Sequence, residues 1–238
     1  YYMGKFCATW LVATLACTAA QAGEPAAGAE KTVEAAPPVD AEGRPLIEKL
    51  GTVALDKVEN SPVVFHGRLF LFHGRGGFHF INLKTGEKGP AMARGHAFGN
   101  AFVDGDTMVV SCSKVGPAVY LFTSKDLEHW ESYKAFDLPE GFKVYNTSIC
   151  RDDDGYAMMF EIGEPPEMAG VRFTAMFARS KDLKDWEVLP PQCNYAKDRY
   201  TAPHALRYLD GYYYDFYLEL NRPDYDPYGF EMCVVRSK

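Results

Sequence analysis

Two glutamates in this sequence stand where apolar, strand-like runs end, a position that leaves a carboxyl group free to do chemistry. Glu161 follows the run 156–160, and Glu219 follows the run 212–218. In general acid/base catalysis one such carboxyl group donates a proton while a second group accepts one. The apolar residues before each glutamate favour a pKa raised by desolvation, which suits a general acid. We therefore predict Glu161 and Glu219 as a catalytic acid/base pair, although either one alone also fits an ordinary carboxylate at a strand end.

Other polar side chains cluster near comparable strand ends, and we predict that they bind substrate. Imidazoles and amides hydrogen-bond hydroxyl groups, and guanidinium groups bind carboxylates or phosphates. A lone histidine is more often structural. No closely spaced pair of metal ligands occurs, so neither a metal ion nor a cofactor is expected. Glu59 and Glu164 are reserve carboxylates. The predicted substrate-binding residues are Asn60, His73, Arg75, His79, His96, Asn100, Asn146, Arg172, Thr201 and His204.

These residues must be positioned by a repeated element. The segment Ser124-Lys-Asp-Leu-Glu-His-Trp-Glu131 recurs as Ser180-Lys-Asp-Leu-Lys-Asp-Trp-Glu187, and a third copy begins at Ser237-Lys238. The copies start 56 and 57 residues apart, and each follows an apolar run. A strand-based repeat of this length is typical of a β-propeller blade. Because Trp130 and Trp186 repeat, we interpret them as blade-packing residues, and we expect Phe78, Phe98 and Tyr145 to stack on sugar rings.

Four hairpin signals follow the same spacing, at His66-Gly67, Asp104-Gly105, Asp154-Gly155 and Asp210-Gly211. Each predicts the turn between the first and second strands of a blade. First-strand starts and second-strand ends then share the opposite face, which is where the predicted site lies. We predict an all-β domain over 46–238, a five-bladed β-propeller truncated in the fourth blade.

The N-terminal region predicts export. Residues 6–20 are apolar but too short to span a bilayer, and Ala20-Gln21-Ala22 is a typical cleavage signal. We predict a signal peptide over 1–22, cleaved after Ala22, and hence a secreted or periplasmic protein. Lipidation at Cys17 is a less favoured alternative. Residues 23–45, rich in Ala, Pro, Glu and Gly, predict a disordered linker.

The charge of the chain restricts its partners. A net charge of −7 over 238 residues disfavours nucleic acid and anionic membranes. No membrane span is expected, and a neutral or weakly charged substrate fits better. The sequence leaves the oligomeric state open.

The repeats behind a signal peptide resemble the five-bladed propeller glycoside hydrolases of the family 43 superfamily, with families 117 and 130 among its relatives. The segment Tyr200-Thr-Ala-Pro-His-Ala-Leu-Arg-Tyr-Leu-Asp-Gly-Tyr-Tyr-Tyr214 is similar to their fourth-blade start. The resemblance covers about 59–238 and implies an enzyme that cleaves glycosidic bonds of an oligo- or polysaccharide.

The acidic triad of family 43 has no residue-by-residue match in this chain. The corresponding segments are Glu59-Asn60-Ser61-Pro62, Tyr145-Asn146-Thr147 and Thr201-Ala-Pro-His204. Three functions stay open. A hydrolase using Glu161 and Glu219 is favoured. A phosphorylase would hold phosphate with Arg and His residues, but export disfavours it. The missing triad favours a carbohydrate-binding propeller without catalysis.

Overall fold

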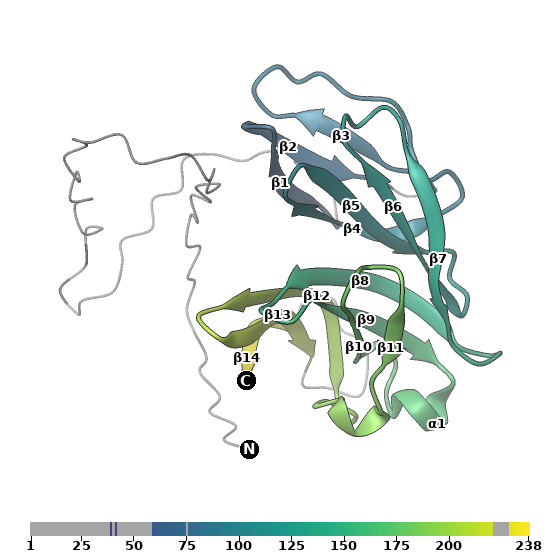
Figure 1. Ribbon diagram of the computed structural model, residues 1–238. Coiled ribbons are helices and arrows are strands. Elements are labelled where there is room, and N and C mark those ends of the chain that lie inside the picture. The colour runs from purple at the N-terminus through teal and green to yellow at the C-terminus, as the bar shows by residue number, and fades with distance from the viewer. Residues whose placement is uncertain (1–38, 40, 42–58, 75, 221–228) are drawn as a thin grey trace. The chain divides into compact units, whose positions relative to one another are not determined.

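The computed structural model of the protein describes residues 39, 41, 59–74, 76–220 and 229–238 (Figure 1). The described residues from 59 onward belong to one compact unit. The predicted signal peptide, nearly all of the predicted linker and Arg75 lie outside the described residues. Among the residues described, no helix is both long and apolar enough to cross a membrane.

The unit consists of four antiparallel sheets, each made of consecutive strands. Two short helical segments, α1 (Pro166–Ala169) and η1 (Pro191–Cys193), lie between strands. The first sheet contains β1 (Ser61–Phe65), β2 (Arg68–His73) and β3 (His79–Asn82). The second contains β4 (Ala97–Asp104), β5 (Thr107–Ser113), β6 (Ala118–Ser124) and β7 (Glu131–Asp137). The third contains β8 (Lys143–Arg151), β9 (Tyr156–Glu164), β10 (Thr174–Ser180) and β11 (Trp186–Val188), and the fourth contains β12 (Tyr200–Leu209), β13 (Tyr212–Leu220) and β14 (Phe230–Ser237).

The first strand of each sheet faces the first strand of the next. β1 contacts β4, β4 contacts β8, and β8 contacts β12. The later strands of each sheet lie progressively outward, as the second and third sheets in Figure 1 show. This is the blade arrangement of a propeller, and the predicted all-β class is confirmed.

The predicted hairpins join the first two strands of every sheet. His66 and Gly67 have φ angles of 47° and 69°, and Asp210 and Gly211 have 52° and 76°. Two successive residues with positive φ make the turn that matches the right-handed twist of paired strands. None of the four second strands is helical, so this part of the prediction holds.

The repeated Ser-Lys-Asp-Leu-x-x-Trp segment is a turn closed by its own side chains. Ser124 Oγ accepts the backbone N–H groups of Asp126 (3.2 Å) and Leu127 (2.9 Å). The Trp130 indole donates to the Leu127 carbonyl (3.2 Å). In the second copy, Trp186 donates to the Leu183 carbonyl (2.7 Å). The repeat therefore encodes blade geometry and not chemistry.

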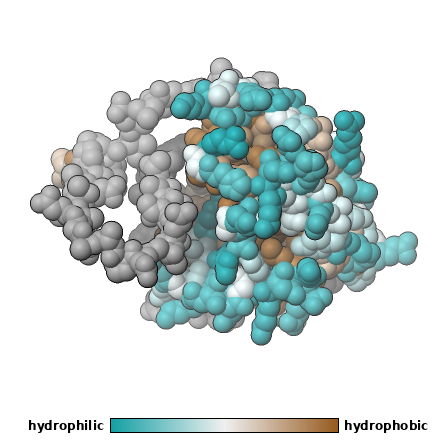
Figure 2. Space-filling model, turned by 45° about the horizontal axis from the view of Figure 1, so that its top comes forward, coloured by the Kyte–Doolittle hydropathy of each residue, from teal (hydrophilic) through white to brown (hydrophobic). Residues whose placement is uncertain are grey.

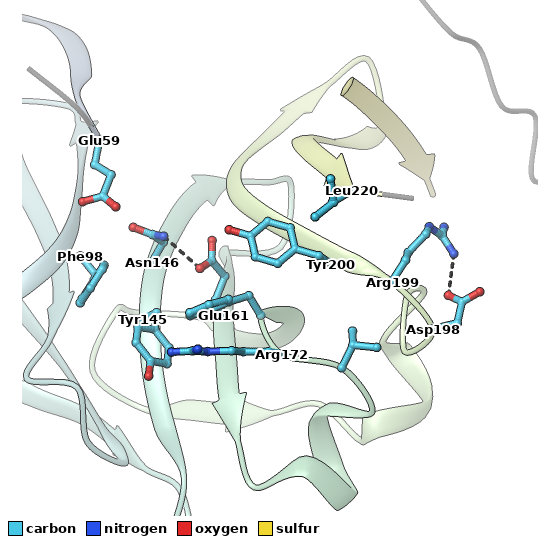
Figure 3. Close-up of a pocket in the computed structure, with 12 residues that line it drawn as sticks. Glu59, Phe98, Tyr145, Asn146, Glu161, Arg172, Asp198, Arg199, Tyr200 and Leu220 are labelled. Atoms are coloured by element: carbon cyan, nitrogen blue, oxygen red, sulfur yellow. Dashed lines mark hydrogen bonds and ion pairs between the residues drawn. The ribbon is translucent and has the colours of Figure 1, made fainter. Parts of the chain in front are cut away.

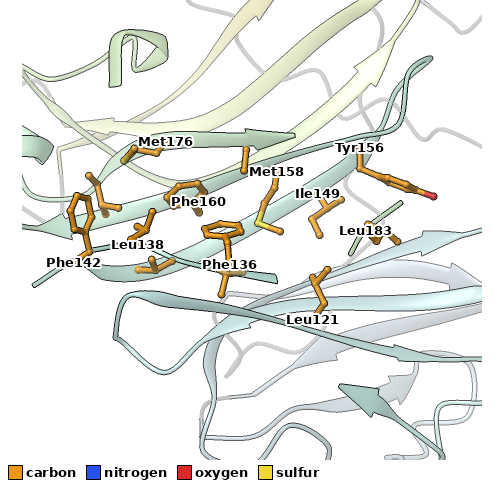
Figure 4. Close-up of a cluster of buried hydrophobic side chains, with 14 of the residues drawn as sticks. Leu121, Phe136, Leu138, Phe142, Ile149, Tyr156, Met158, Phe160, Met176 and Leu183 are labelled. Carbon is orange, nitrogen blue, oxygen red and sulfur yellow. The ribbon is translucent and has the colours of Figure 1, made fainter. Parts of the chain in front are cut away.

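The core lies between neighbouring blades. Leu121, Phe136 and Leu138 of the second sheet and its following loop meet Ile149, Met158 and Phe160 of the third (Figure 4). The Trp130 ring stacks on Phe80 of the first sheet, with centroids 5.8 Å apart. Such contacts support the interpretation of the repeated tryptophans as packing residues. On the face shown in Figure 2, hydrophilic side chains predominate and hydrophobic ones show in recesses.

The first strands of the second, third and fourth sheets are irregular near their starts. β4, β8 and β12 start at Ala97, Lys143 and Tyr200, several residues before the apolar runs that indicate them. Each contains a register shift near its start. Phe78 was expected to stack on a sugar ring, and this expectation is wrong. Its side chain is 1% exposed and packs on Phe72 in the core.

Candidate functional site

A cavity of about 710 Å³ opens where first strands begin and second strands end (Figure 3). Strands β4, β8, β9, β12 and β13 and the loops beside them supply its walls. Antiparallel neighbours place the start of one strand beside the end of the next, which explains why residues far apart in sequence meet here. The cavity is lined by Glu59, Phe98, Tyr145, Asn146, Glu161, Val171, Arg172, Phe173, Asp198, Arg199, Tyr200 and Leu220.

β-Bulges push side chains into this cavity. The register shifts lie between Ala97 and Asn100 in β4 and between Val144 and Thr147 in β8. A bulge leaves a residue unpaired and redirects its side chain. Phe98, Tyr145 and Asn146 are the residues so released, and all three line the cavity.

The aromatic rings of the wall support one another. Tyr145 meets Phe98 and Phe173 edge to face, with centroids 5.2 and 4.8 Å apart. Phe173 in turn meets Tyr200 at 5.5 Å. A continuous aromatic wall beside polar groups suits the apolar faces and hydroxyl edges of a sugar ring.

Glu161 is the buried acid of the cavity. Its side chain is 0% exposed, and its Oε2 accepts a hydrogen bond from Asn146 Nδ2 at 2.9 Å. Burial raises the pKa of Glu161 to about 7, although the charge of His204 and the Asn146 hydrogen bond oppose the rise. Because Oε2 accepts the amide and Oε1 has no hydrogen-bond partner among the described residues, the proton belongs on Oε1. This is the protonation state that a general acid requires near neutral pH.

A charged network lies behind Glu161. His204 Nδ1 faces Asp215 Oδ2 at 2.9 Å, and its Nε2 faces the Thr201 carbonyl at 2.5 Å. Tyr195 also donates to Asp215 Oδ2, at 2.9 Å. Burial disfavours a charge on His204, but the Asp215 carboxylate and the other acceptors outweigh it and raise the His204 pKa. With an acceptor at each nitrogen, the ring is an imidazolium whose charge acts on Glu161.

Glu219 has a different environment. It is 3% exposed, its Oε2 forms an ion pair with Arg199 Nε at 3.0 Å, and the same oxygen accepts a hydrogen bond from the Tyr217 hydroxyl at 2.9 Å. Arg199 lines the cavity, whereas Glu219 is not among the lining residues. Arg199 also pairs with Asp198 at 2.7 Å, as Figure 3 shows. Glu219 therefore holds Arg199 in the cavity wall. Of the described glutamates, Glu161 and Glu59 are the two that line the cavity.

Several predicted binding residues make contacts elsewhere. His96 is 6% exposed, its ring packs edge to face on Tyr120 and Phe122, and burial lowers its pKa. Asn100 Nδ2 donates to Ser61 Oγ at 2.9 Å, which ties the second blade to the first.

Of the residues predicted to bind substrate, the structure brings Asn146 and Arg172 into the cavity. His204 and Thr201 lie behind Glu161 in the charged network. The His79 ring faces the Gly89 carbonyl at 3.0 Å, and His73 is the residue opposite His79 in the pairing of β2 with β3. Asn60, His73, His79, His96 and Asn100 are not among the lining residues, and Arg75 is not described.

Sequence reasoning missed part of the wall. Asp198 and Arg199 lie in the loop between η1 and β12, and Phe173 lies in the loop between α1 and β10 of the third sheet, where no strand pattern fixes their positions. The one local signal was the pair Asp198-Arg199 directly before the segment that begins at Tyr200. Within the described residues, no group of three or more His, Cys, Asp or Glu side chains is placed to hold a metal ion.

Comparison with known proteins places the fold. No protein-family model and no curated protein sequence matches this chain. Among solved structures, an α-L-arabinofuranosidase from Fusarium graminearum in complex with an iminosugar inhibitor is 13% identical, with a TM-score of 0.56 over 75% of this chain and 61% of that one. A GH43 endo-arabinanase from Bacillus licheniformis is 13% identical, with a TM-score of 0.54 over 78% and 73%. An α-L-arabinanase from Penicillium chrysogenum complexed with arabinobiose is 11% identical, with a TM-score of 0.57 over 78% and 64%.

These likenesses define the class at the level of fold. The chain shares the sheet arrangement of these arabinan-degrading glycoside hydrolases and spans about three fifths of the length of the Fusarium enzyme. At 11–13% identity the likeness extends to the fold alone, so the chemistry must come from the cavity itself.

Proposed function

We propose that this protein is a glycoside hydrolase in which Glu161 is the general acid. One observation carries the proposal: a fully buried carboxyl group with a raised pKa lies at a cavity walled by aromatic rings and an amide. Glu161 would protonate the oxygen of the departing sugar as the glycosidic bond breaks. The fold shared with arabinanases and an arabinofuranosidase supports this class of reaction.

The second carboxyl group is either Glu59 or Glu219. Glu59 lines the cavity, and its charge acts to raise the pKa of Glu161, which requires the two groups to be close. Glu219 is occupied by Arg199 and Tyr217. We therefore assign Glu59 the role of activating water or stabilising the developing positive charge, and Glu219 the role of holding the wall.

The finer features of the proposal concern architecture and location. The four sheets would be blades of a five-bladed propeller, as the 56- and 57-residue repeat supports. Residues 1–22 would direct export, so the mature chain would begin at Gly23. N-terminal mass spectrometry of protein expressed in a bacterium checks the cleavage, and an uncut chain or a lipidated Cys17 would contradict it.

The catalytic proposal is tested by turnover and binding together. The full chain is assayed on a panel of neutral and acidic oligosaccharides, arabino-oligosaccharides among them. Glu161→Gln should lower kcat by roughly 100-fold or more while sugar binding survives, because the amide keeps the shape but cannot donate the proton. Glu187→Gln, at an exposed residue of β11 outside the cavity, is the matched control and should retain full turnover.

Two outcomes would contradict the proposal. Unchanged turnover in Glu161→Gln would remove Glu161 from the mechanism. A wild-type chain that binds sugars but cleaves none would favour a carbohydrate-binding propeller.

A further inference from the structure

Two arginines, Arg172 and Arg199, are among the described residues that line the cavity, and they differ in their partners. Arg199 is neutralised by Asp198 at 2.7 Å and by Glu219 at 3.0 Å. Arg172 is exposed and forms no ion pair with any residue that the structure describes. Its recorded contact is with the ring of Phe173, whose centroid lies 4.8 Å from the guanidinium carbon. The cavity therefore presents one cation without a protein counter-ion in the described part of the chain.

The aromatic wall holds Arg172 in place. Phe173 is fixed between Tyr145 and Tyr200, and its carbonyl accepts the Thr201 N–H at 3.0 Å. A guanidinium that lies over a ring uses its flat face for that contact and keeps its N–H edge available. In Figure 3 the Arg172 side chain runs below Glu161 towards Tyr145, inside the region where a sugar must lie to reach Glu161.

The neighbouring acid does not satisfy this cation. Glu161 makes its recorded hydrogen bond with Asn146, and its raised pKa keeps it largely protonated below neutral pH. A protonated carboxyl group is a poor counter-ion for a guanidinium. A ligand that brings its own negative charge would supply the missing partner.

We propose that the sugar bound next to the cleaved bond is a uronic acid, whose ring carboxylate is held by Arg172. This inference rests on the proposed hydrolytic function and names the class of its substrate. A carboxylate matches the edge of one guanidinium with two parallel charge-assisted hydrogen bonds. Arabinobiose, the ligand in the Penicillium structure, has no carboxylate, so a uronate held by Arg172 would be a different class of ligand.

A carboxylate fits the cavity better than a phosphate group. A phosphate dianion carries more charge and three strong acceptor oxygens, and usually needs several donors. Among the described lining residues, Arg172 is the one arginine without an ion pair, and it shares the cavity with the carboxylate of Glu59 in a chain of net charge −7. One negative charge balances one guanidinium, whereas two would be repelled by the acidic wall.

The test compares sugars that differ only in the carboxylate. Galacturonate and galactose, and glucuronate and glucose, are titrated by calorimetry into the full-length Glu161→Gln chain, so that turnover does not interfere. Because charge-assisted hydrogen bonds are strong, at least one uronate should bind with roughly 10- to 100-fold higher affinity than the neutral sugar of its pair. Raising the salt concentration should weaken uronate binding and leave neutral-sugar binding unchanged.

Variants assign the effect to Arg172. Arg172→Gln should reduce uronate binding to the level of the neutral sugar, and Arg172→Lys should retain part of the preference, because lysine keeps the charge but loses the fork. Arg68→Gln is the matched control. Arg68 is also exposed and stacked on a phenylalanine, with 5.3 Å to the Phe70 centroid, but it is not among the cavity-lining residues.

The outcomes separate this inference from the proposed function. Equal binding of uronates and neutral sugars, or a preference that survives Arg172→Gln, overturns the inference while hydrolysis of neutral sugars still supports the enzyme. Inorganic phosphate that binds in an Arg172-dependent way, without uronate binding, overturns it in favour of a phosphate site. Absence of both binding and turnover for every sugar overturns the proposed function as well.

Discussion

Compared with the wild-type chain, the Glu161→Gln variant should have a higher relative stability above neutral pH than below pH 4.5. The pKa of Glu161 is about 7 in the folded chain, against an ordinary value of 4.5. The folded state therefore binds this proton more tightly than the unfolded state does. The stabilisation is fully present below pH 4.5 and is lost as pH rises towards and through 7, because the buried carboxyl must then ionise.

The magnitude follows from the size of the pKa difference. A shift from 4.5 to about 7 corresponds to about 3 kcal/mol of unfolding free energy. Glutamine has nearly the same shape and cannot ionise, so it removes this dependence. Relative to Glu161→Gln, the wild-type chain should lose about 3 kcal/mol of stability between pH 4 and pH 8.

Urea denaturation of both proteins at half-unit pH steps measures this difference directly. Other titrating groups are common to both chains and largely cancel in the comparison. Glu187→Gln is the control, and its difference from wild type should be nearly flat, because Glu187 is exposed. A pH-independent difference for Glu161→Gln, or stability of the wild type that rises relative to the variant from pH 4.5 to 7, would refute a buried, protonated Glu161.

Three further substitutions test the surroundings of the site. Asn146→Ala removes the 2.9 Å hydrogen bond that stabilises the Glu161 carboxylate, so the pKa of Glu161 should rise further. The high-pH limb of the kcat profile should then move to higher pH, and an unchanged limb would contradict this. Trp130→Ala removes a ring stacked on the preceding blade and should cost about 2–4 kcal/mol in urea denaturation, against near-zero loss if blade packing does not depend on it. Arg199→Gln leaves the buried Glu219 without its counter-ion and should cost about 3–5 kcal/mol in urea denaturation at pH 7; a near-zero loss would show that the ion pair is unimportant.

Local chemistry made much of the fold predictable. The hairpin between β12 and β13 needs two residues with positive φ, and Asp210-Gly211 supplies them cheaply. The repeat turn is equally local, because the side chains of Ser124 and Asp126 bind backbone groups within three residues. Strand polarity then places Asn146 and Glu161 at one end of neighbouring strands, where they do meet.

The rest of the site depends on contacts that sequence patterns do not encode. The partner of Glu219 is Arg199, which lies between η1 and β12 and reaches the carboxylate only through the path of that loop. A bulge in β4 also changes which residue faces the cavity. Past the register shift, Asn100 turns towards Ser61 and Phe98 takes the place on the cavity wall. Because one extra residue reverses the faces of a strand, alternation alone assigns such positions wrongly.

Backbone strain gives an independent reason to place function in this cavity. Glu59, Phe98 and Phe173 line it with φ angles of 56°, 56° and 61°, a region that costs a non-glycine residue about 1 kcal/mol or more. At Leu127 and Leu183 the same geometry recurs in both copies of the repeat turn, where side-chain hydrogen bonds explain it.

The three strained residues of the cavity come from different blades and lie outside the repeat turn. The strained residues, the buried carboxyl group of Glu161 and the charged His204–Asp215 pair behind it all lie at one end of the strands. Each of these features lowers the stability of the folded chain. The opposite end follows ordinary turn rules. Such costs persist where selection acts on chemistry rather than on stability. Glu161 is therefore singled out by the energetics of this chain itself, in addition to the fold that it shares with glycoside hydrolases.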